Sequence, residues 1–341
     1  MWKKVIIAGS VLVAGICVWK MGSSESETNL TTQSIFAMDT YMDITVYGQE
    51  SEQAVELAVA EIHRLDALFS TGNEKSEVAT LNQEKEGVLS EDYAYLLERS
   101  MELHELTQGL FDITIYPIMR AWGFTDKAYR VPEDEELTTL LQHVDTSKLN
   151  YDKDAKTLRL PQEVEVDFGG IAKGYTSIRV AQLLKEQGIK SAILNLGGNV
   201  QTVGLKPDGS RWKIAIKSPY EDLAYLGVLS IGETAVITSG GYERCFEENG
   251  ETYHHIIDTG NGYPAQSGVV SVTIVCEDGT LADGLSTSLF VMGKEKAITY
   301  WKAHNEVFEF VLCDEDRRLY VTQGLADNFT SDLPIEIIYV D

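Results

Sequence analysis

Residues 166–174 carry residue types that suit a phosphorylated ligand at the start of a helix. The segment reads VDFGGIAKG and places a carboxylate, two adjacent glycines and a lysine directly before a helical pattern. Glycine lets the backbone approach a ligand closely, and the first turn of a helix offers free N–H groups to an anion. The P-loop pattern G-x-x-x-x-G-K-[ST] does not occur in the chain. The segment therefore predicts either an anion site of another kind or a purely structural turn.

Two adjacent histidines, His254 and His255, follow the polar segment TSGGYER at residues 238–244. Neighbouring side chains of a strand point to opposite faces, so one of the pair can face a site while the other faces solvent or the core. Histidine titrates near neutrality and can move protons. The pair predicts either a proton-transfer residue or ordinary polar positions on a strand.

The segment ADGLST brings Asp283, Ser286 and Thr287 together at the start of a predicted helix. These residues offer hard oxygen donors. Mg²⁺ takes few protein oxygens, and phosphates and waters complete its octahedron. Alone, the segment also fits an Asp N-cap followed by helical serine and threonine. A further segment, LNLGGN at residues 194–199, alone indicates only a turn between strands, and no dinucleotide-binding G-x-G-x-x-G occurs.

A strand-rich scaffold with a few helices must position these groups. Helical spacing of apolar residues predicts helices, with Ser51 and Ser90 as N-caps of the first two, over residues 51–69, 90–107, 132–143, 175–187 and 282–291. A loop is expected over residues 70–83. Strands are predicted around Leu158 and Val164 and over residues 41–47, 191–196, 202–205, 212–217, 227–232, 235–240, 254–258, 269–276, 307–313 and 335–340. Without regular βαβ alternation, this pattern favours an α+β fold with one compact domain over residues 34–341.

The charge of the chain narrows the classes of partner. Lys and Arg number 28 and Asp and Glu 53, so the formal net charge is −25. Such a surface repels phosphate backbones and disfavours nucleic acid, and it excludes polybasic attachment to a membrane. An anionic ligand then needs a metal ion or backbone N–H groups.

The cysteines form no C-x-x-C pair, so neither a disulfide framework nor a structural zinc site is predicted from Cys17, Cys245, Cys276 and Cys313.

The first 22 residues have the pattern of a signal peptide or an N-terminal membrane anchor. Two lysines precede an apolar run at residues 5–19, which has the length of a signal-peptide core and is short for a spanning helix. The polar residues 23–33 predict a tether. Cys17 follows Ala-Gly-Ile, which resembles a bacterial lipoprotein signal except for Ile16. We expect an exported protein at the outer face of the bacterial cytoplasmic membrane, held by a lipid on Cys17 or by an uncleaved anchor.

Together and in this order, the chemistry-bearing segments resemble the ApbE family of FAD:protein FMN transferases. The resemblance runs from about Phe36 to about Gly293, with a continuation to the C-terminus, and no single segment is decisive. It rests on MDTYMDITVYG, FSTGNEKSEVATLN, GLFDITIYPIMRAWGF, VDFGGIAKGY, LNLGGNV, TSGGYERCFEENGETYHHIID and ADGLSTSLFVMG. It implies a single T-fold-like α+β domain, in which helices flank a strand-rich mixed sheet.

The resemblance also implies an activity. Members cleave FAD at its pyrophosphate, release AMP and attach FMN through a phosphoester to Thr or Ser of extracytoplasmic electron-transfer proteins. FAD as substrate, one Mg²⁺ and an acceptor flavoprotein are therefore implied. The implied cofactor-binding residues are Met38, Leu110, Phe111, Asp112, Asp167, Lys173 and Ile257. The implied metal ligands are the Gly170 carbonyl, Asp283 and Thr287, with Ser286 beside them, and the implied catalytic residues are Asp283 and His255, the latter for proton transfer.

Two residues depart from the family pattern. Gly72 stands where members often carry an aromatic residue, and Thr259 replaces the proline of the usual HIIDP.

Two other functions stay open: an FAD pyrophosphatase that uses water as acceptor, and a non-enzymatic flavin-binding protein at the membrane surface. Both enzymes need Asp283 and His255, whereas a flavin carrier needs only the flavin-binding residues. Nothing in the chain resembles the family's acceptor motif, so the acceptor is expected to be another chain.

Overall fold

The computed structural model describes residues 29–340. The signal peptide or anchor predicted for residues 1–22, the lipid on Cys17 and most of the tether predicted for residues 23–33 lie outside the described residues. The last part of that tether differs from the prediction, because residues 30–33 form the first half of strand β1 (Leu30–Ala37). They pair in antiparallel register with the second half of β2 (Thr40–Tyr47). Among the described residues, none of the helices combines the length and apolar character needed to cross a bilayer.

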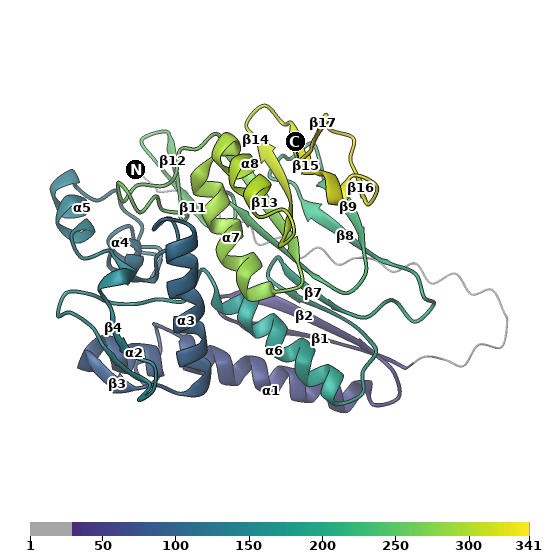
Figure 1. Cartoon of the computed structure of the whole chain (residues 1–341), viewed down its shortest axis with the longest axis horizontal. Helices are drawn as coiled ribbons and strands as arrows, with labels where there is room; N and C mark the ends of the chain where they lie inside the picture. Colours follow the sequence, from purple (N-terminus) through teal and green to yellow (C-terminus); the bar gives the residue numbers. More distant parts are fainter. Residues whose placement is uncertain (1–28, 341) are drawn as a thin grey trace.

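A large sheet runs through the centre of the described part of the chain (Figure 1). Its nine strands follow the order β1-β2-β6-β7-β10-β13-β14-β15-β17. The strands beyond β1 and β2 are β6 (Ser191–Leu196), β7 (Asn199–Val203), β10 (Ala235–Gly240), β13 (Val269–Cys276), β14 (Glu309–Asp314), β15 (Leu319–Thr322) and β17 (Ile335–Ile338). Neighbours pair antiparallel except β15 and β17, so the sheet is mixed, as predicted.

Helices cover one face of this sheet, and α1, α6 and α7 run side by side along it (Figure 1). They span Ser51–Phe69, Ala172–Glu186 and Gly279–Met292. Alternation explains the layer, because Met42, Ile44 and Val46 of β2 all point into the core beneath the helices. Helix α3 (Glu91–Leu106) packs on α7 at the end of the layer.

A second sheet covers the opposite face of the central one. It contains β8 (Trp212–Lys217), β9 (Tyr225–Ile231) and the short β16 (Phe329–Thr330). Its inner face buries Trp212 and Leu229 against Val236 of β10 and Val311 of β14. The central sheet is therefore covered on both faces, which fixes the strands that carry the candidate site.

Smaller elements complete the described chain. They are α2 (Glu77–Glu84), β3 (Glu86–Val88), η1 (Ile113–Ile115), α4 (Tyr116–Ala121), α5 (Asp134–Leu141), η2 (Thr146–Lys148), β4 (Asn150–Asp152), β5 (Thr157–Arg159), β11 (Cys245–Glu248), β12 (Glu251–His254), α8 (Lys294–Ala303) and η3 (Gln323–Leu325). The β11–β12 hairpin and α4 share an aromatic cluster around Trp122, Phe246 and Tyr253. This cluster fixes the chain on either side of His255.

The predicted α+β fold in one compact domain is confirmed, while several local predictions need correction. Ser90 caps α3, with Oγ accepting from Tyr93 N at 3.4 Å, but Ser51 does not cap α1. Ser51 lies inside that helix, and its hydroxyl bonds Thr31 Oγ1 at 2.8 Å. The loop predicted over residues 70–83 contains α2, because Ser76 Oγ accepts from Ala79 N at 2.9 Å and starts the helix.

Two predicted strands are wrong. The chain around Val164 is irregular, because Val164 N donates to Pro161 O in a turn. The strand predicted over residues 254–258 ends at His254. Beyond it, Ile257 makes only an isolated bridge to Pro264. The chain then turns, so the segment after His255 is a loop whose direction depends on tertiary contacts.

Candidate functional site

The starts of helices α6 and α7 cross at very short distance. A Cβ atom on Gly174 of α6 would lie 2.1 Å from the Gly279 carbonyl oxygen and 2.7 Å from Asp283 Cβ, both on α7. Only glycine permits this approach. It lets Gly174 N donate a hydrogen bond to Asp283 Oδ2 at 2.8 Å. Asp283 is buried, with 4% of the residue exposed. Its carboxylate is thereby fixed at the first turn of α6.

This hydrogen bond also frees a backbone oxygen. In an uninterrupted helix the Gly174 N–H would bond the carbonyl four residues earlier, that of Gly170. Because the N–H is given to Asp283, the Gly170 carbonyl accepts no hydrogen bond from any residue in the range 29–340. The chain just before α6 therefore offers an unpaired carbonyl oxygen, four residues before the Gly174 N–H that binds Asp283.

Hydroxyl groups of α7 and β10 lie next to Asp283. Ser286 is fully buried, and its Oγ donates to the Asp283 carbonyl at 2.8 Å and bonds Ser239 Oγ at 2.7 Å. Thr287 Oγ1 makes only a longer contact of 3.4 Å with the same Ser239. Ser286 is thus committed to internal hydrogen bonds, whereas the Thr287 hydroxyl keeps capacity for a ligand.

Charged side chains converge on the same place. Burial raises the pKa of Asp283, and the positive charge of Lys173 opposes that rise. Burial likewise raises the pKa of Asp167, opposed by a hydrogen bond of 3.0 Å from Gly169 N and by the charges of Arg244 and Lys173. Lys173 therefore faces both carboxylates, and the Val-Asp-Phe-Gly-Gly turn, α6 and α7 form one electrostatic cluster.

The two histidines lie in different surroundings, although only His254 belongs to a strand. His254 ends β12 with Nε2 bonded to the Ala265 carbonyl at 3.1 Å and its ring edge-on to Phe290, so it belongs to the core. Burial, followed by the charges of Arg244 and Lys173, lowers the pKa of His255 to about 3. His255 is neutral at pH 7, and its Nδ1 lies 3.3 Å from the Arg244 carbonyl. Because a carbonyl only accepts, Nδ1 carries the proton and Nε2 is free to take one.

The turn with Leu110 and Phe111 reaches the start of α6. Gln108 and Gly109 have φ of +54° and +85°, so the chain reverses in the left-handed region just after α3. Phe111 N donates to Thr107 Oγ1 at 3.0 Å. The Phe111 ring lies against Gly170, where a Cβ would meet it at 3.2 Å. Leu110 is half-buried at the tip of the turn.

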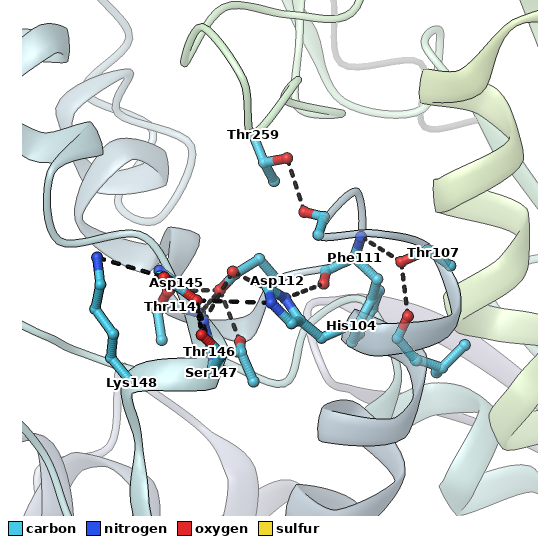
Figure 2. Close-up of polar contacts among 12 residues, drawn as sticks. His104, Thr107, Phe111, Asp112, Thr114, Asp145, Thr146, Ser147, Lys148 and Thr259 are labelled. Carbon is cyan, nitrogen blue, oxygen red and sulfur yellow. Dashed lines mark hydrogen bonds and ion pairs between the residues drawn. The ribbon is translucent and has the colours of Figure 1, made fainter.

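Asp112 lies beneath this turn with both carboxylate oxygens occupied (Figure 2). Oδ1 accepts from Thr114 N at 2.8 Å and from Thr146 Oγ1 at 2.8 Å. Oδ2 accepts from Thr146 N at 3.0 Å and pairs with His104 Nδ1 at 3.1 Å. The structure thus gives the Asp112 side chain a supporting position beneath the turn.

Met38 and Ile257 occupy different surroundings. Met38 lies in the β1–β2 turn with φ of +49°, its N donates to Asp66 Oδ1 at 3.1 Å, and its sulfur accepts from Thr176 Oγ1 of α6 at 3.7 Å. It therefore lies close to the cluster. Ile257 is buried in the aromatic cluster with Trp122, so its side chain supports the loop after His255.

Some residues of the site were not singled out from the sequence. Asn199, 2% exposed on β7, lowers the pKa of Asp283, and its Nδ2 has no hydrogen-bond acceptor at normal distance in the described chain. Ser239 and Arg244 lie within the quoted TSGGYER segment but had no assigned role. The feature of the sequence that could have pointed to Asn199 is a polar residue at a strand position that faces the helix layer.

The turn predicted at LGGN is confirmed, since Leu196 pairs with Asn199 on either side of it.

The donor set restricts the kind of metal that fits. Within residues 29–340, no three His, Cys, Asp or Glu side chains are arranged to hold an ion. A cation here must use one carboxylate, that of Asp283, together with carbonyl and hydroxyl oxygens. This is the sparse oxygen set that Mg²⁺ accepts when phosphates and waters supply the remaining ligands, and it does not suit zinc.

Comparisons with known proteins show which sequences this chain resembles. The model of the ApbE family matches residues 38–312. The FAD:protein FMN transferase of Haemophilus influenzae is 30% identical over 322 residues, which cover 89% of this chain and 91% of that protein. The FAD:protein FMN transferase of Vibrio cholerae is 34% identical over 263 residues, which cover 75% and 78%.

Solved structures show the same fold. The ApbE protein of Thermotoga maritima superposes with a TM-score of 0.81 at 32% identity, covering 87% of this chain and 98% of that one. The flavin transferase ApbE of Vibrio cholerae superposes with a TM-score of 0.76 at 28% identity, covering 90% and 97%.

Proposed function

The chain belongs to the ApbE family, and we propose its reaction on that premise. It is a flavin transferase that moves FMN from FAD to a threonine or serine hydroxyl of a protein acceptor, releasing AMP. The reaction depends on Mg²⁺. The observation that carries this proposal is that two oxygen donors, the buried Asp283 carboxylate and the unpaired Gly170 carbonyl, both lie at the crossing of α6 and α7.

The residues present fit a magnesium ion. Asp283, the Gly170 carbonyl and the Thr287 hydroxyl would hold it, and the ion would neutralise charge on the pyrophosphate oxygens of FAD. The buried Asn199 Nδ2 offers a donor beside them. Since the chain carries a net charge of −25, local positive charge from Lys173 also supports the binding of an anionic substrate.

His255 serves as the proton acceptor. Neutral at pH 7, with Nε2 unprotonated, it takes the proton of the acceptor hydroxyl as that oxygen attacks the phosphorus on the FMN side. The new P–O bond joins FMN to the protein, and the bond to the AMP phosphate breaks. The electron pair leaves with AMP.

The acceptor and the location complete the proposal. We place the enzyme at the outer face of the cytoplasmic membrane, held by an uncleaved anchor or by a lipid on Cys17. The support is the apolar run at residues 5–19 between two lysines and a polar stretch. The acceptor is an extracytoplasmic electron-transfer protein with a Thr or Ser flavinylation motif. Labelling cells with radioactive palmitate separates the two anchors, because label in the wild type that is lost in Cys17→Ser identifies a lipid on Cys17, and no label in either protein identifies the uncleaved anchor.

The reaction is tested with the full chain in detergent. The protein is mixed with FAD, Mg²⁺ and an acceptor peptide containing a threonine motif, and mass spectrometry follows the peptide while chromatography follows AMP. An FMN adduct formed with Mg²⁺ and lost on chelation supports the transferase. AMP and free FMN without adduct, for any acceptor offered, identify an FAD pyrophosphatase. Intact FAD under all conditions identifies a flavin carrier and contradicts the enzyme.

A further inference from the structure

One threonine outside the proposed metal and proton-transfer groups joins two parts of the site. Thr259 Oγ1 donates to the Gly109 carbonyl at 2.8 Å (Figure 2). Gly109 begins the turn that presents Leu110 and Phe111, and Thr259 lies in the loop after His255. Within the described residues, this is the single hydrogen bond between the segments 107–112 and 254–263.

The Thr259 contact lies opposite the bonds that tie this turn to α3. The turn is held from α3, where Thr107 Oγ1 accepts from Phe111 N at 3.0 Å and His104 Nδ1 bonds the Phe111 carbonyl at 3.1 Å. Gln108 and Gly109, both left-handed, follow the end of α3, and their N–H groups donate to the Glu105 and His104 carbonyls at 3.1 and 2.8 Å. In the described chain, the Gly109 carbonyl has Thr259 as its only hydrogen-bond donor.

The loop that carries Thr259 is itself fixed. Asp258 N donates to the Tyr263 carbonyl at 2.8 Å, and Gly262 N donates to the Asp258 carbonyl at 2.8 Å. The Trp122 indole N–H donates to the Gly262 carbonyl at 2.8 Å in the buried aromatic cluster. The Thr259 hydroxyl is therefore presented from a hydrogen-bonded and packed support, and its bond can fix the position of the Gly109 carbonyl.

A displaced turn would disturb the proposed FAD site. The Phe111 ring lies directly against Gly170, whose carbonyl is a proposed metal ligand. We propose that Thr259 is a positioning residue that sets the Gly109–Leu110–Phe111 turn for FAD and ties it to the segment carrying His255. This inference rests on the proposed function. The HIIDP motif has proline at this position, which has no hydroxyl, so the tie is a property of this chain.

The test compares variants with and without the hydroxyl. Thr259→Val removes it at equal size, Thr259→Ala removes it without adding an apolar branch, and Thr259→Ser keeps it. The control is Thr299→Val on α8, whose hydroxyl bonds the Glu295 carbonyl within its own helix at 2.9 Å. FAD affinity is measured by flavin fluorescence with the metal chelated. KM and kcat for FMN transfer are measured with Mg²⁺.

Loss of one such hydrogen bond is expected to weaken FAD binding by about tenfold. Thr259→Val and Thr259→Ala should raise the Kd and KM for FAD by that factor with kcat changed less than about twofold. Thr259→Ser and Thr299→Val should match the wild type. Equal FAD affinity in the valine, alanine and wild-type proteins overturns the inference, as does an equal loss in the serine variant. A wild type that binds FAD but transfers no FMN contradicts the proposed function alone, because the affinity comparison still tests Thr259.

Discussion

The crossing of α6 and α7 and the turn at residues 108–112 are built in different ways. At the crossing, Gly174 and Asp283 meet through backbone geometry that leaves no room for a side chain. The turn is held by side-chain hydrogen bonds from two segments: Thr107 at the end of α3 accepts from Phe111 N and His104 of α3 bonds the Phe111 carbonyl, while Thr259 from the loop after His255 donates to the Gly109 carbonyl. The comparison indicates that the groups proposed for chemistry are fixed by close backbone packing, whereas the turn proposed to bind the flavin depends on side-chain hydrogen bonds.

Asp283→Asn is expected to have the largest effect. The amide keeps the size of the side chain but removes the charge that a metal needs, so FMN transfer should fall by about 10³-fold or more. FAD binding without metal should persist, because the turn is untouched. Transfer kinetics at saturating Mg²⁺ check this, with the exposed Asp154→Asn as control. If the variant keeps most of its activity, Asp283 at the crossing of α6 and α7 does not hold the catalytic metal.

Gly174→Ala tests the rigidity of the crossing itself. The added Cβ would lie 2.1 Å from the backbone oxygen of Gly279, so the helices must separate. Overpacking against backbone should lower the free energy of unfolding by about 3 kcal/mol, measured by urea denaturation. The control Gly188→Ala removes a glycine whose Cβ direction is open, though its φ of +77° itself disfavours alanine by about 1 kcal/mol. A smaller loss for Gly174→Ala than for Gly188→Ala would contradict the close crossing.

His255→Gln should reduce FMN transfer by about 10²-fold with little change in FAD affinity, since the loss is that of a proton acceptor. Because burial and nearby positive charge lower the pKa of His255 to about 3, the imidazole stays neutral as the pH falls from 8 to 5. Wild-type pH–rate profiles should therefore show no loss of activity with a midpoint near 6.5. Such a midpoint, absent from the His255→Gln variant, would contradict this assignment. His63→Gln, exposed on α1, is the control.

His104→Gln tests the polar network of the turn and should have the smallest effect. A hydrogen bond to Asp112 raises the pKa of His104, so protonated His104 stabilises the folded state below its unfolded pKa. That stabilisation, about 1 kcal/mol, is lost as the pH rises through the raised folded value. The stability difference between wild type and variant should therefore be largest near pH 6 and shrink toward pH 9. Denaturation curves at several pH values check this, and a pH-independent difference would contradict the ion pair.

The sequence predicted the crossing better than the turn, for a physical reason. Gly174 and Asp283 lie in short segments whose residue types point to helix starts and oxygen ligands, and the structure brings these segments together. The role of Asp112 is invisible in its own segment, because one partner, His104, lies in the preceding helix and the other, Thr146, lies 34 residues further along the chain. Periodicity likewise found α1 but missed α2, where a capping serine, not an apolar stripe, carries the signal.

The proposal that Asp283 and the Gly170 carbonyl hold a metal ion is best tested by locating that ion in a crystal structure. Crystals of the protein grown with FAD and Mn²⁺, a spectroscopic substitute for Mg²⁺, would yield an anomalous difference map. We expect a peak about 2.0–2.3 Å from an Asp283 carboxylate oxygen and from the Gly170 carbonyl oxygen, next to the FAD pyrophosphate. A peak bound to other residues, or FAD bound in the active crystals without any ion at Asp283, would contradict it.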